Sequence, residues 1–147
     1  MRTTVSQLTL RNGRANSGGG VLVRQGGPTF SNVVIENNEA WEDQGGGIAV
    51  LDGAHVTLTN VVVRNNRAGR GGGVSVTGAN SQVYAMNSLL STNQATVAAG
   101  AALVSVGAAL ILTDTVIAEN VSGGVAGGVM FDRLTGGSMT GGRFQDN

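Results

Sequence analysis

Apolar and polar residues alternate in short stretches that recur along this chain at a nearly constant spacing. Aligning the stretches places a large apolar anchor at positions 10, 35, 63, 90, 117 and 144, with steps of 25, 28, 27, 27 and 27 residues. Another apolar position lies five residues before each anchor, and its neighbours are mostly Thr and Ser. A period of two predicts a strand with one buried face, and a repeat of this length predicts a solenoid.

Each anchor opens a six-residue phrase made of a large apolar residue, two polar residues, Asn, any residue and Ala. Full copies of the phrase occupy residues 35–40, 63–68 and 90–95, and looser copies occupy 10–15, 117–122 and 144–147. Clusters of Gly follow, for example at 45–47 and 71–73, and an alternating apolar pair after each cluster predicts a second short strand. The 25 Gly residues and the lack of sustained helical spacing argue against helices.

Short strands, corners rich in Gly and Asn, and about 27 residues per turn together predict a parallel β-helix. In this all-β solenoid each turn stacks on the turn before it, about 4.8 Å away. We expect a single domain over residues 1–147 with about five and a half turns. No amphipathic cap is visible at either end of the repeat. Unpaired strand edges therefore favour a homo-oligomer or end-to-end self-association.

Two columns of Asn are expected along the solenoid, because residues about 27 apart become vertical neighbours. The first column is expected to form an inward ladder whose amides satisfy backbone groups at a corner. It comprises Asn38, Asn66, Asn93, Asn120 and Asn147. The second column lies six residues earlier, is also expected to be structural, and comprises Asn32, Asn60, Asn87 and Asp114. Gln7 and Gly13 hold these two positions in the first repeat.

The phrase, followed by a Gly-Gly-Val or Gly-Gly-Ile strand opener, resembles the repeat of the chlamydial-type polymorphic outer membrane proteins. The opener stands at residues 19–21, 46–48 and 72–74. Related repeats occur in large bacterial surface and secreted β-helix proteins. The resemblance implies a single-stranded, right-handed parallel β-helix and a secreted or cell-surface location. This chain departs from the family pattern in that Phe occupies only one anchor, Phe144.

Composition excludes several classes of function. The formal net charge is zero, so the basic stripe that nucleic-acid binding needs is missing. All nine basic residues are Arg, which excludes phosphate loops and Schiff-base chemistry that depend on Lys. The chain has no Cys, and neither a Cys-based metal site nor a cofactor is expected. No signal peptide pattern opens the sequence, and the uncharged segment 95–112 is interpreted as repeat rather than as a membrane span.

The carboxylates are scattered along the repeats rather than clustered as in carbohydrate-active β-helix enzymes. Glu36 lies in a column between Arg11 and Arg64, and Glu39 lies in one between Arg14 and Arg67. Opposite charges in neighbouring turns help to fix the register in which the turns stack. Such surface pairs each contribute only about 0–1 kcal/mol to stability. The spacing therefore predicts pairing between turns and no catalytic residues.

The best candidate for a ligand-binding site is the segment Trp41, Glu42, Asp43 and Gln44. It is predicted to be a loop, two residues longer than its counterpart at 69–70. The Trp41 ring offers a face on which a sugar can stack, and the two carboxylates could hold Ca²⁺. Adjacent residues on an extended segment point apart, however, and two carboxylates make a weak metal site. We therefore predict no metal and keep carbohydrate binding or cleavage at residues 41–44 as an alternative function.

Two further patterns concern single residues and outward columns. The only His, His55, has no Asp or Ser in a triad position and is expected to be a solvated corner residue.

Outward Thr and Ser columns in the first three repeats resemble the hydroxyl arrays of ice-binding β-solenoids. Tyr84 and Met86 interrupt these columns in the fourth repeat, and Thr is also favoured on any solvent-facing strand. Ice binding remains a third alternative.

These observations favour a non-catalytic β-helix module over an enzyme. The expected role is that of a structural stalk or an adhesion or binding rod. Its expected partners are further copies of the chain and a polysaccharide or host-surface ligand, without nucleic acid or a membrane span.

Overall fold

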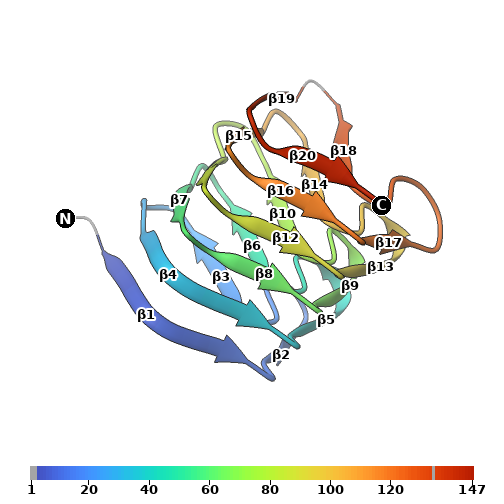
Figure 1. Cartoon of the computed structure of the whole chain (residues 1–147), viewed down its shortest axis with the longest axis horizontal. Coiled ribbons are helices and arrows are strands. Elements are labelled where there is room, and N and C mark those ends of the chain that lie inside the picture. Colours follow the sequence, from blue (N-terminus) through green and yellow to red (C-terminus); the bar gives the residue numbers. More distant parts are fainter. Residues whose placement is uncertain (1–2, 134) are drawn as a thin grey trace.

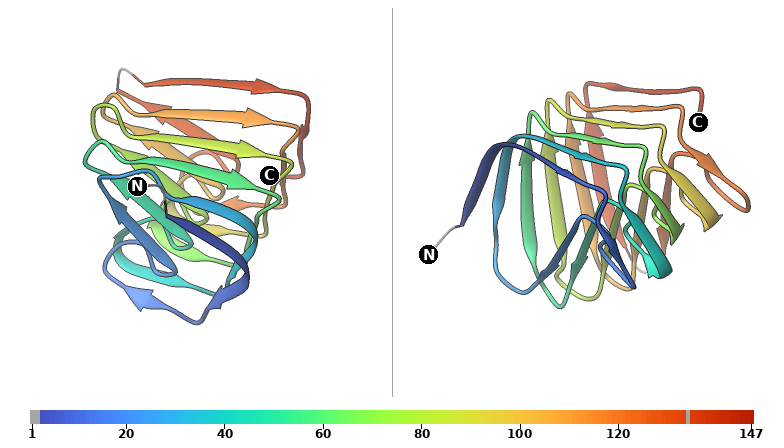
Figure 2. Two further views of the ribbon diagram at one scale, coloured as in Figure 1. Left: turned by 90° about the vertical axis from the view of Figure 1, so that its left-hand side faces the viewer. Right: turned by 90° about the horizontal axis from the view of Figure 1, so that it is seen from below.

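The fold is a solenoid of parallel strands that coils around one continuous core. The computed structural model describes residues 3–133 and 135–147. Within these ranges all strands pair in parallel with strands about 27 residues away, and no helix is present. Figure 1 shows the chain advancing coil by coil from the N-terminus to the C-terminus, and Figure 2 shows the coils stacked along one axis. The predicted all-β, parallel β-helix is confirmed.

The first sheet contains the stretches that carry the apolar anchors. Its ten strands are β1 (Thr4–Arg11), β4 (Thr29–Glu36), β7 (His55–Thr59), β8 (Val62–Arg64), β11 (Gln82–Met86), β12 (Leu89–Ser91), β15 (Ala109–Thr113), β16 (Val116–Ala118), β19 (Gly136–Thr140) and β20 (Arg143–Gln145). β1 and β4 are continuous, whereas later turns divide the same stretch into two strands. We number the turns by their first strands: β1, β4, β7, β11, β15 and, for the partial sixth turn, β19.

Two five-stranded sheets complete the coils. The second sheet comprises β2 (Arg14–Ala15), β5 (Glu39–Gln44), β9 (Arg67–Arg70), β13 (Gln94–Ala98) and β17 (Val121–Ser122). The third sheet comprises β3 (Val21–Arg24), β6 (Ile48–Leu51), β10 (Val74–Thr77), β14 (Ala102–Ser105) and β18 (Val129–Asp132). Four strands of the third sheet are the predicted strands after Gly clusters, whereas β14 follows a single Gly, Gly100, and lies outside that prediction. The second sheet is not predicted, because its strands are too short or too irregular to show alternation.

Neighbouring turns are in the register that the repeat predicts. The anchors at 10, 35, 63, 90, 117 and 144 are successive partners in the first sheet. In the second sheet Ala40 pairs with Ala68, and Ala68 pairs with Ala95. Residues one repeat apart are therefore vertical neighbours.

Inward-facing residues of all three sheets form one hydrophobic core. Its largest fully buried side chains include Ile35, Ile48, Leu58, Leu90, Leu110 and Ile117. Burying one such side chain contributes about 1.5–3 kcal/mol. The second to fifth turns each supply one or more of them, so the stabilisation is distributed along this part of the axis.

The uncharged segment 95–112 belongs to this core. It spans the end of β13, all of β14 and most of β15. Ala101, Ala102 and Val104 within it are fully buried. Among the described residues there is no helix that is long and apolar enough to cross a membrane.

The second Asn column shapes an outward corner that divides the first sheet. Asn32, Asn60, Asn87 and Asp114 have φ between 47° and 55°. Asn and Asp adopt this left-handed conformation more readily than other non-Gly residues. All four side chains are exposed, and Asn60 Nδ2 donates to Asn32 Oδ1 at 3.3 Å. The Asn and Asp residues of this column are therefore explained by their backbone conformation. The buried ladder described below is explained by its side-chain hydrogen bonds.

The segment 41–44 is not the loop that the sequence predicts. It forms most of β5, which pairs with β9 at Ala40 and again at Gln44, with a shift of register between the two points. The N–H of Asp43 also donates to the backbone oxygen of Asn16 in the turn before, at 3.2 Å. Backbone bonds to both adjacent turns keep the inserted residues extended, which is the reason for the difference.

Candidate functional site

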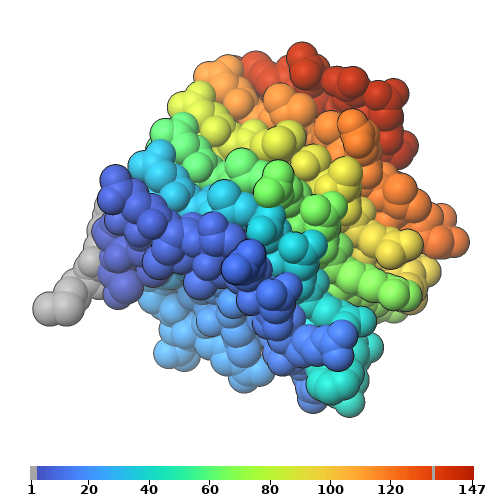
Figure 3. Space-filling view, turned by 60° about the horizontal axis from the view of Figure 1, so that its bottom comes forward, coloured from blue at the N-terminus to red at the C-terminus, as the bar shows by residue number. Residues whose placement is uncertain are grey.

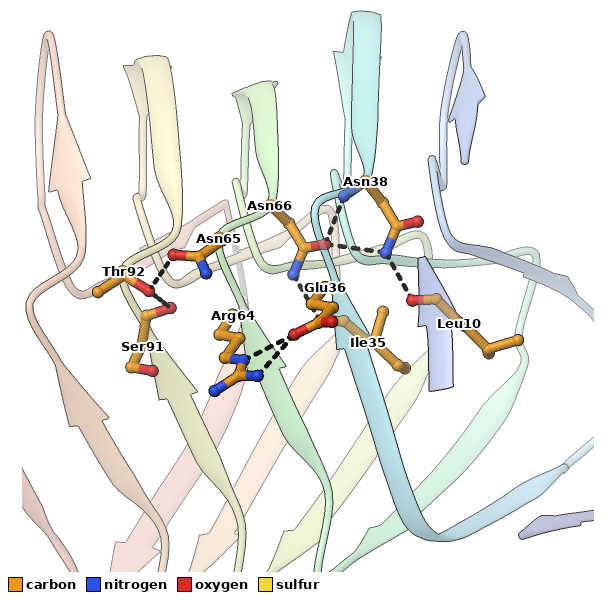
Figure 4. Close-up of polar contacts among 9 residues, drawn as sticks. All are labelled: Leu10, Ile35, Glu36, Asn38, Arg64, Asn65, Asn66, Ser91 and Thr92. Atoms are coloured by element: carbon orange, nitrogen blue, oxygen red, sulfur yellow. Dashed lines mark hydrogen bonds and ion pairs between the residues drawn. The ribbon is translucent and has the colours of Figure 1, made fainter. Parts of the chain in front are cut away.

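Each Asn of the inward ladder bonds to the turn before it. Asn66 Oδ1 accepts hydrogen bonds from the backbone N–H and from Nδ2 of Asn38, both at 3.0 Å. Asn66 Nδ2 donates to the backbone oxygen of Ile35 at 2.9 Å (Figure 4). Asn38 and Ile35 are both buried, so the Asn66 amide satisfies backbone groups that water does not reach.

The same bonds repeat along the whole column and confirm the predicted Asn ladder. Contacts from Nδ2 to Oδ1 of 2.8–3.0 Å join Asn38, Asn66, Asn93, Asn120 and Asn147 in order. On its N-terminal side the ladder ends at Gly13, whose N–H donates to Asn38 Oδ1 at 2.9 Å. Gly13 has no side-chain amide, so Asn38 is the first member of the ladder. Each later Asn bonds to the turn before it, which gives the ladder a direction.

Buried hydroxyl groups form a second polar column that the sequence pattern does not predict. Ser88 Oγ accepts from the N–H of Val61 at 3.1 Å and donates to the backbone oxygen of Met86 at 2.9 Å. One turn later, Thr115 Oγ1 donates to the backbone oxygen of Thr113 at 3.0 Å. Every buried side-chain N or O atom among the described residues has a hydrogen-bond partner. The hydroxyl groups of this column therefore satisfy backbone groups of the interior.

The Gly clusters form the corner between the second and third sheets and pack at very short range against the next turn. A Cβ on Gly46 would lie 2.5 Å from the backbone oxygen of Arg67, and a Cβ on Gly47 would lie 2.6 Å from that of Gly73. No side chain fits at such distances. The clusters thus hold the corner between the second and third sheets against the backbone of the next turn.

A groove runs along the axis where these two sheets meet. It has a volume of about 390 Å³ and extends from the second turn to the fifth. Because neighbouring strands are about 4.8 Å apart, three steps of the solenoid give it a length of about 14 Å. Its polar lining includes Asp43, Arg70, Thr77, Ser105, Asp132 and Arg133. Leu103, Val97 and Met130 add apolar surface between these groups.

Gln44 ties the wall of the groove to the third sheet. Its Oε1 accepts from Ser75 Oγ at 2.8 Å and from Thr77 Oγ1 at 3.0 Å. Thr77 also shares a hydrogen bond of 3.0 Å with Ser105, one turn further along the axis. Ser75 is fully buried beneath Gln44. Gln44, Thr77 and Ser105 in the wall of the groove are therefore joined in one network that crosses three turns.

The structure separates the residues of the predicted binding segment. Trp41 is 63 % exposed and lines a hollow of about 170 Å³ with Glu39 and Arg67. Asp43 instead lines the groove, and Glu42 is exposed and lines neither space. The groove thus brings Asp43 together with residues of the third to fifth turns. The sequence pattern did not connect those residues to Asp43.

Charged side chains pair across turns at two of the expected positions. Arg64 Nη2 lies 2.7 Å from Glu36 Oε2, and Arg14 Nε lies 3.4 Å from Glu39 Oε2. Both pairs are partly exposed, so each contributes about 0–1 kcal/mol. Among the described residues, no three His, Asp or Glu side chains gather in a way that could hold a metal ion.

His55 and Tyr84 line a shallow hollow of about 470 Å³ on the outer face of the first sheet. His55 is exposed at the start of β7, and the Tyr84 hydroxyl donates to Gln82 Oε1 at 2.9 Å. Thr29, Thr57 and Tyr84 are successive partners in one outward column. Tyr84 is 41 % exposed and interrupts the hydroxyl column at the fourth turn, where the sequence places it.

The comparisons with known proteins agree with this architecture. A family model described as "Right handed beta helix region" matches residues 2–133, from the first turn to just beyond β18. No curated protein and no solved structure matches the chain. The match covers most of the sequence and the same turns whose parallel register is described above. The chain therefore belongs to the right-handed β-helix family.

Proposed function

We propose that this β-helix is a non-catalytic module that serves as a stalk or binding rod of a secreted or surface bacterial protein. The observation that carries the proposal is the inward ladder, which runs without a break from Asn38 to Asn147. It adds side-chain bonds between turns to the backbone bonds of three sheets, which suits a stiff element. The resemblance to the repeat of the chlamydial-type polymorphic outer membrane proteins supports the surface location.

The use of polar residues inside the rod supports the same role. The side chains of the Asn ladder, Ser88 and Thr115 bond to backbone groups of their own or neighbouring turns. These interior polar groups thus hold neighbouring turns together. Its outer surface is left for binding, and the groove is a concave polar region of that surface.

A test for catalysis separates the rod from a carbohydrate-active enzyme. The purified chain is incubated with uronan and neutral polysaccharides, and new reducing ends and unsaturated products are measured. We expect no product above a heat-unfolded control. Cleavage that is lost in Asp43→Asn, while Glu42→Gln retains it, would overturn the non-catalytic proposal and assign the reaction to the groove.

The groove favours a second candidate function, the binding of a linear saccharide. Asp43 and Asp132 provide acceptors, Arg70 and Arg133 provide donors, and the four formal charges cancel. Such a mixture suits a ligand with many hydroxyl groups better than a polyanion, which needs an excess of positive charge. The volume of about 390 Å³ lies within the range of small-ligand sites.

Titration calorimetry with a panel of neutral and acidic oligosaccharides tests this candidate. Arg70→Gln and Asp43→Asn are expected to weaken binding at least about tenfold, because each removes a charged partner of a hydroxyl group. Glu42→Gln is the matched control, since Glu42 neighbours Asp43 but lies outside the groove. Trp41→Ala distinguishes the two sites: loss of binding in this variant alone would move the ligand to the Trp41 hollow.

A further inference from the structure

The second sheet is recessed at the third turn, between two longer strands. Between successive points of pairing, β5 has three residues and β13 has two, whereas β9 has only Gly69. The extra residues of β5 and β13 are exposed, and Gly69 is half-buried. A strand that carries extra residues bends at that point. Gly69 is therefore the floor of a saddle between the second and fourth turns, in the middle of the stacked bands that Figure 3 shows.

The Trp41 hollow and the groove lie end to end along these three strands. Within two residues the lining passes from hollow to groove: from Trp41 to Asp43 in β5, from Gly69 to Arg70 in β9, and from Thr96 to Val97 in β13. A Cβ added to Gly69 would come within 4 Å of one atom only, the backbone oxygen of Asp43, at 3.0 Å. The space above Gly69 is therefore open, and no side chain of this residue separates the hollow from the groove.

The inserted residues of β5 alternate between facing the saddle and facing away from it. Residues two apart on an extended strand point to the same side. Trp41 lines the hollow and Asp43 lines the groove, whereas Glu42 between them lines neither. Two residues of extended strand span about 7 Å, which is the scale of one to two linked sugar rings. An aromatic ring and a carboxylate are thus presented side by side at this spacing.

The chemistry of the saddle suits an uncharged ligand with one apolar face. Trp41 and Val97, on the two strands that flank β9, are 63 % and 49 % exposed. An indole ring offers a broad apolar surface together with a polar N–H. The other charged groups of the hollow, Glu39 and Arg67, cancel in formal charge, as do the four in the groove. Neither space has the excess of positive charge that a polyanion needs.

From this arrangement we propose that the hollow and the groove form one shared site for a neutral saccharide of at least two rings. One ring stacks on Trp41, the chain crosses the third turn over Gly69, and the next ring lies between Asp43 and Arg70. The inference rests on the saccharide-binding candidate proposed above, and it adds an aromatic subsite and a minimum ligand length to that candidate.

Fluorescence of Trp41, the only Trp of the chain, tests the shared site directly. The probes are glucose, mannose and galactose oligomers of one, two and four rings. A disaccharide or tetrasaccharide that binds is expected to shift the emission of Trp41 and to reduce its quenching by acrylamide at least about twofold, because a ring covers the indole. A monosaccharide fills only one of the two spaces and is expected to bind at least about tenfold more weakly.

Variants on either side of the saddle show whether the two spaces act together. Trp41→Ala is expected to weaken disaccharide binding at least about tenfold in calorimetry. Asp43→Asn is expected to weaken the fluorescence titration of Trp41 by a similar factor, although Trp41 itself is unchanged. Glu42→Gln is the matched control and is expected to leave both measurements unchanged. Circular dichroism verifies that each variant is folded.

The outcomes separate the shared site from the function on which it rests. If no saccharide binds, the saccharide candidate fails and the shared site fails with it. If a saccharide binds and Arg70→Gln weakens its binding, but Trp41→Ala has no effect, the groove alone is the site and the shared site is overturned. A response of Trp41 that Asp43→Asn leaves unchanged also overturns it, since the hollow then binds independently of the groove.

Discussion

Replacing Asn66 by Ala removes one member of the inward ladder and leaves the rest of the core in place. Asn66 Oδ1 no longer accepts from the N–H of Asn38, and Nδ2 no longer donates to the backbone oxygen of Ile35. Ile35 is fully buried and Asn38 is 2 % exposed, so neither group can turn to water. At about 1–3 kcal/mol for each unsatisfied group, and with some local relaxation, we expect a loss of about 2–4 kcal/mol.

The measurement is urea unfolding followed by far-UV circular dichroism, with the free energy of unfolding compared at an unchanged m-value. Asn65→Gly is the matched control. Asn65 is exposed, its φ is 53°, and its Oδ1 accepts one hydrogen bond from Thr92. Gly adopts this φ freely, so the control is expected to lose less than about 1 kcal/mol.

The outcome that refutes the reasoning is a loss below about 0.5 kcal/mol for Asn66→Ala, or a loss equal to that of Asn65→Gly. Either result means that the backbone groups of the corner find other partners. Asn66→Asp examines the donor half separately, because it keeps an acceptor for Asn38 but has no N–H for Ile35. It also places a charge in the core, so we expect it to be at least as destabilising as Ala.

Three further changes follow from the same structure, each measured by the shift in the free energy of unfolding. Gly72→Ala places a Cβ against a backbone oxygen and is expected to cost about 2 kcal/mol or more, whereas Gly136→Ala has room and is expected to cost less than about 1 kcal/mol. Ser88→Ala removes a buried hydroxyl that bonds two backbone groups, and about 1–2 kcal/mol is expected. Arg64→Gln breaks the exposed pair with Glu36 and is expected to cost less than about 1 kcal/mol, with a difference that shrinks in high salt.

The repeat period and the inward ladder could be predicted from the sequence because they depend on residue type at a fixed spacing. Ile35, Val63 and Leu90 differ in shape but share a class, and Asn38 and Asn66 are identical, so the columns are visible without a structure. The second sheet could not be predicted in this way. Its strands around Ala40 and Ala68 have too few regular residues for alternation to be recognised.

The hydroxyl column was hidden for a different reason. Val61 and Ser88 hold equivalent places in successive turns, and a change from an apolar to a polar residue conceals the column. The groove was hidden because it joins Asp43 to Ser105 and Asp132, which belong to different sheets and turns. The Gly clusters lie in the corners between the two sheets and pack closely on the next turn. The signal that could have pointed to the groove was the polar residue that ends the last three strands of the third sheet, which is Thr77, Ser105 and Asp132 in turn.

The direction of the ladder imposes an order on biosynthesis. The N–H of Asn66 donates to the Asn93 side chain, and the carbonyl of Val63 accepts from it. Both groups lack this partner until the ribosome has added Asn93, one repeat later. A newly made coil therefore keeps unmatched polar groups until its successor emerges. We expect folding to proceed from the first coil toward the last. A substitution that removes the ladder Asn of one repeat is expected to destabilise the coil synthesised just before it.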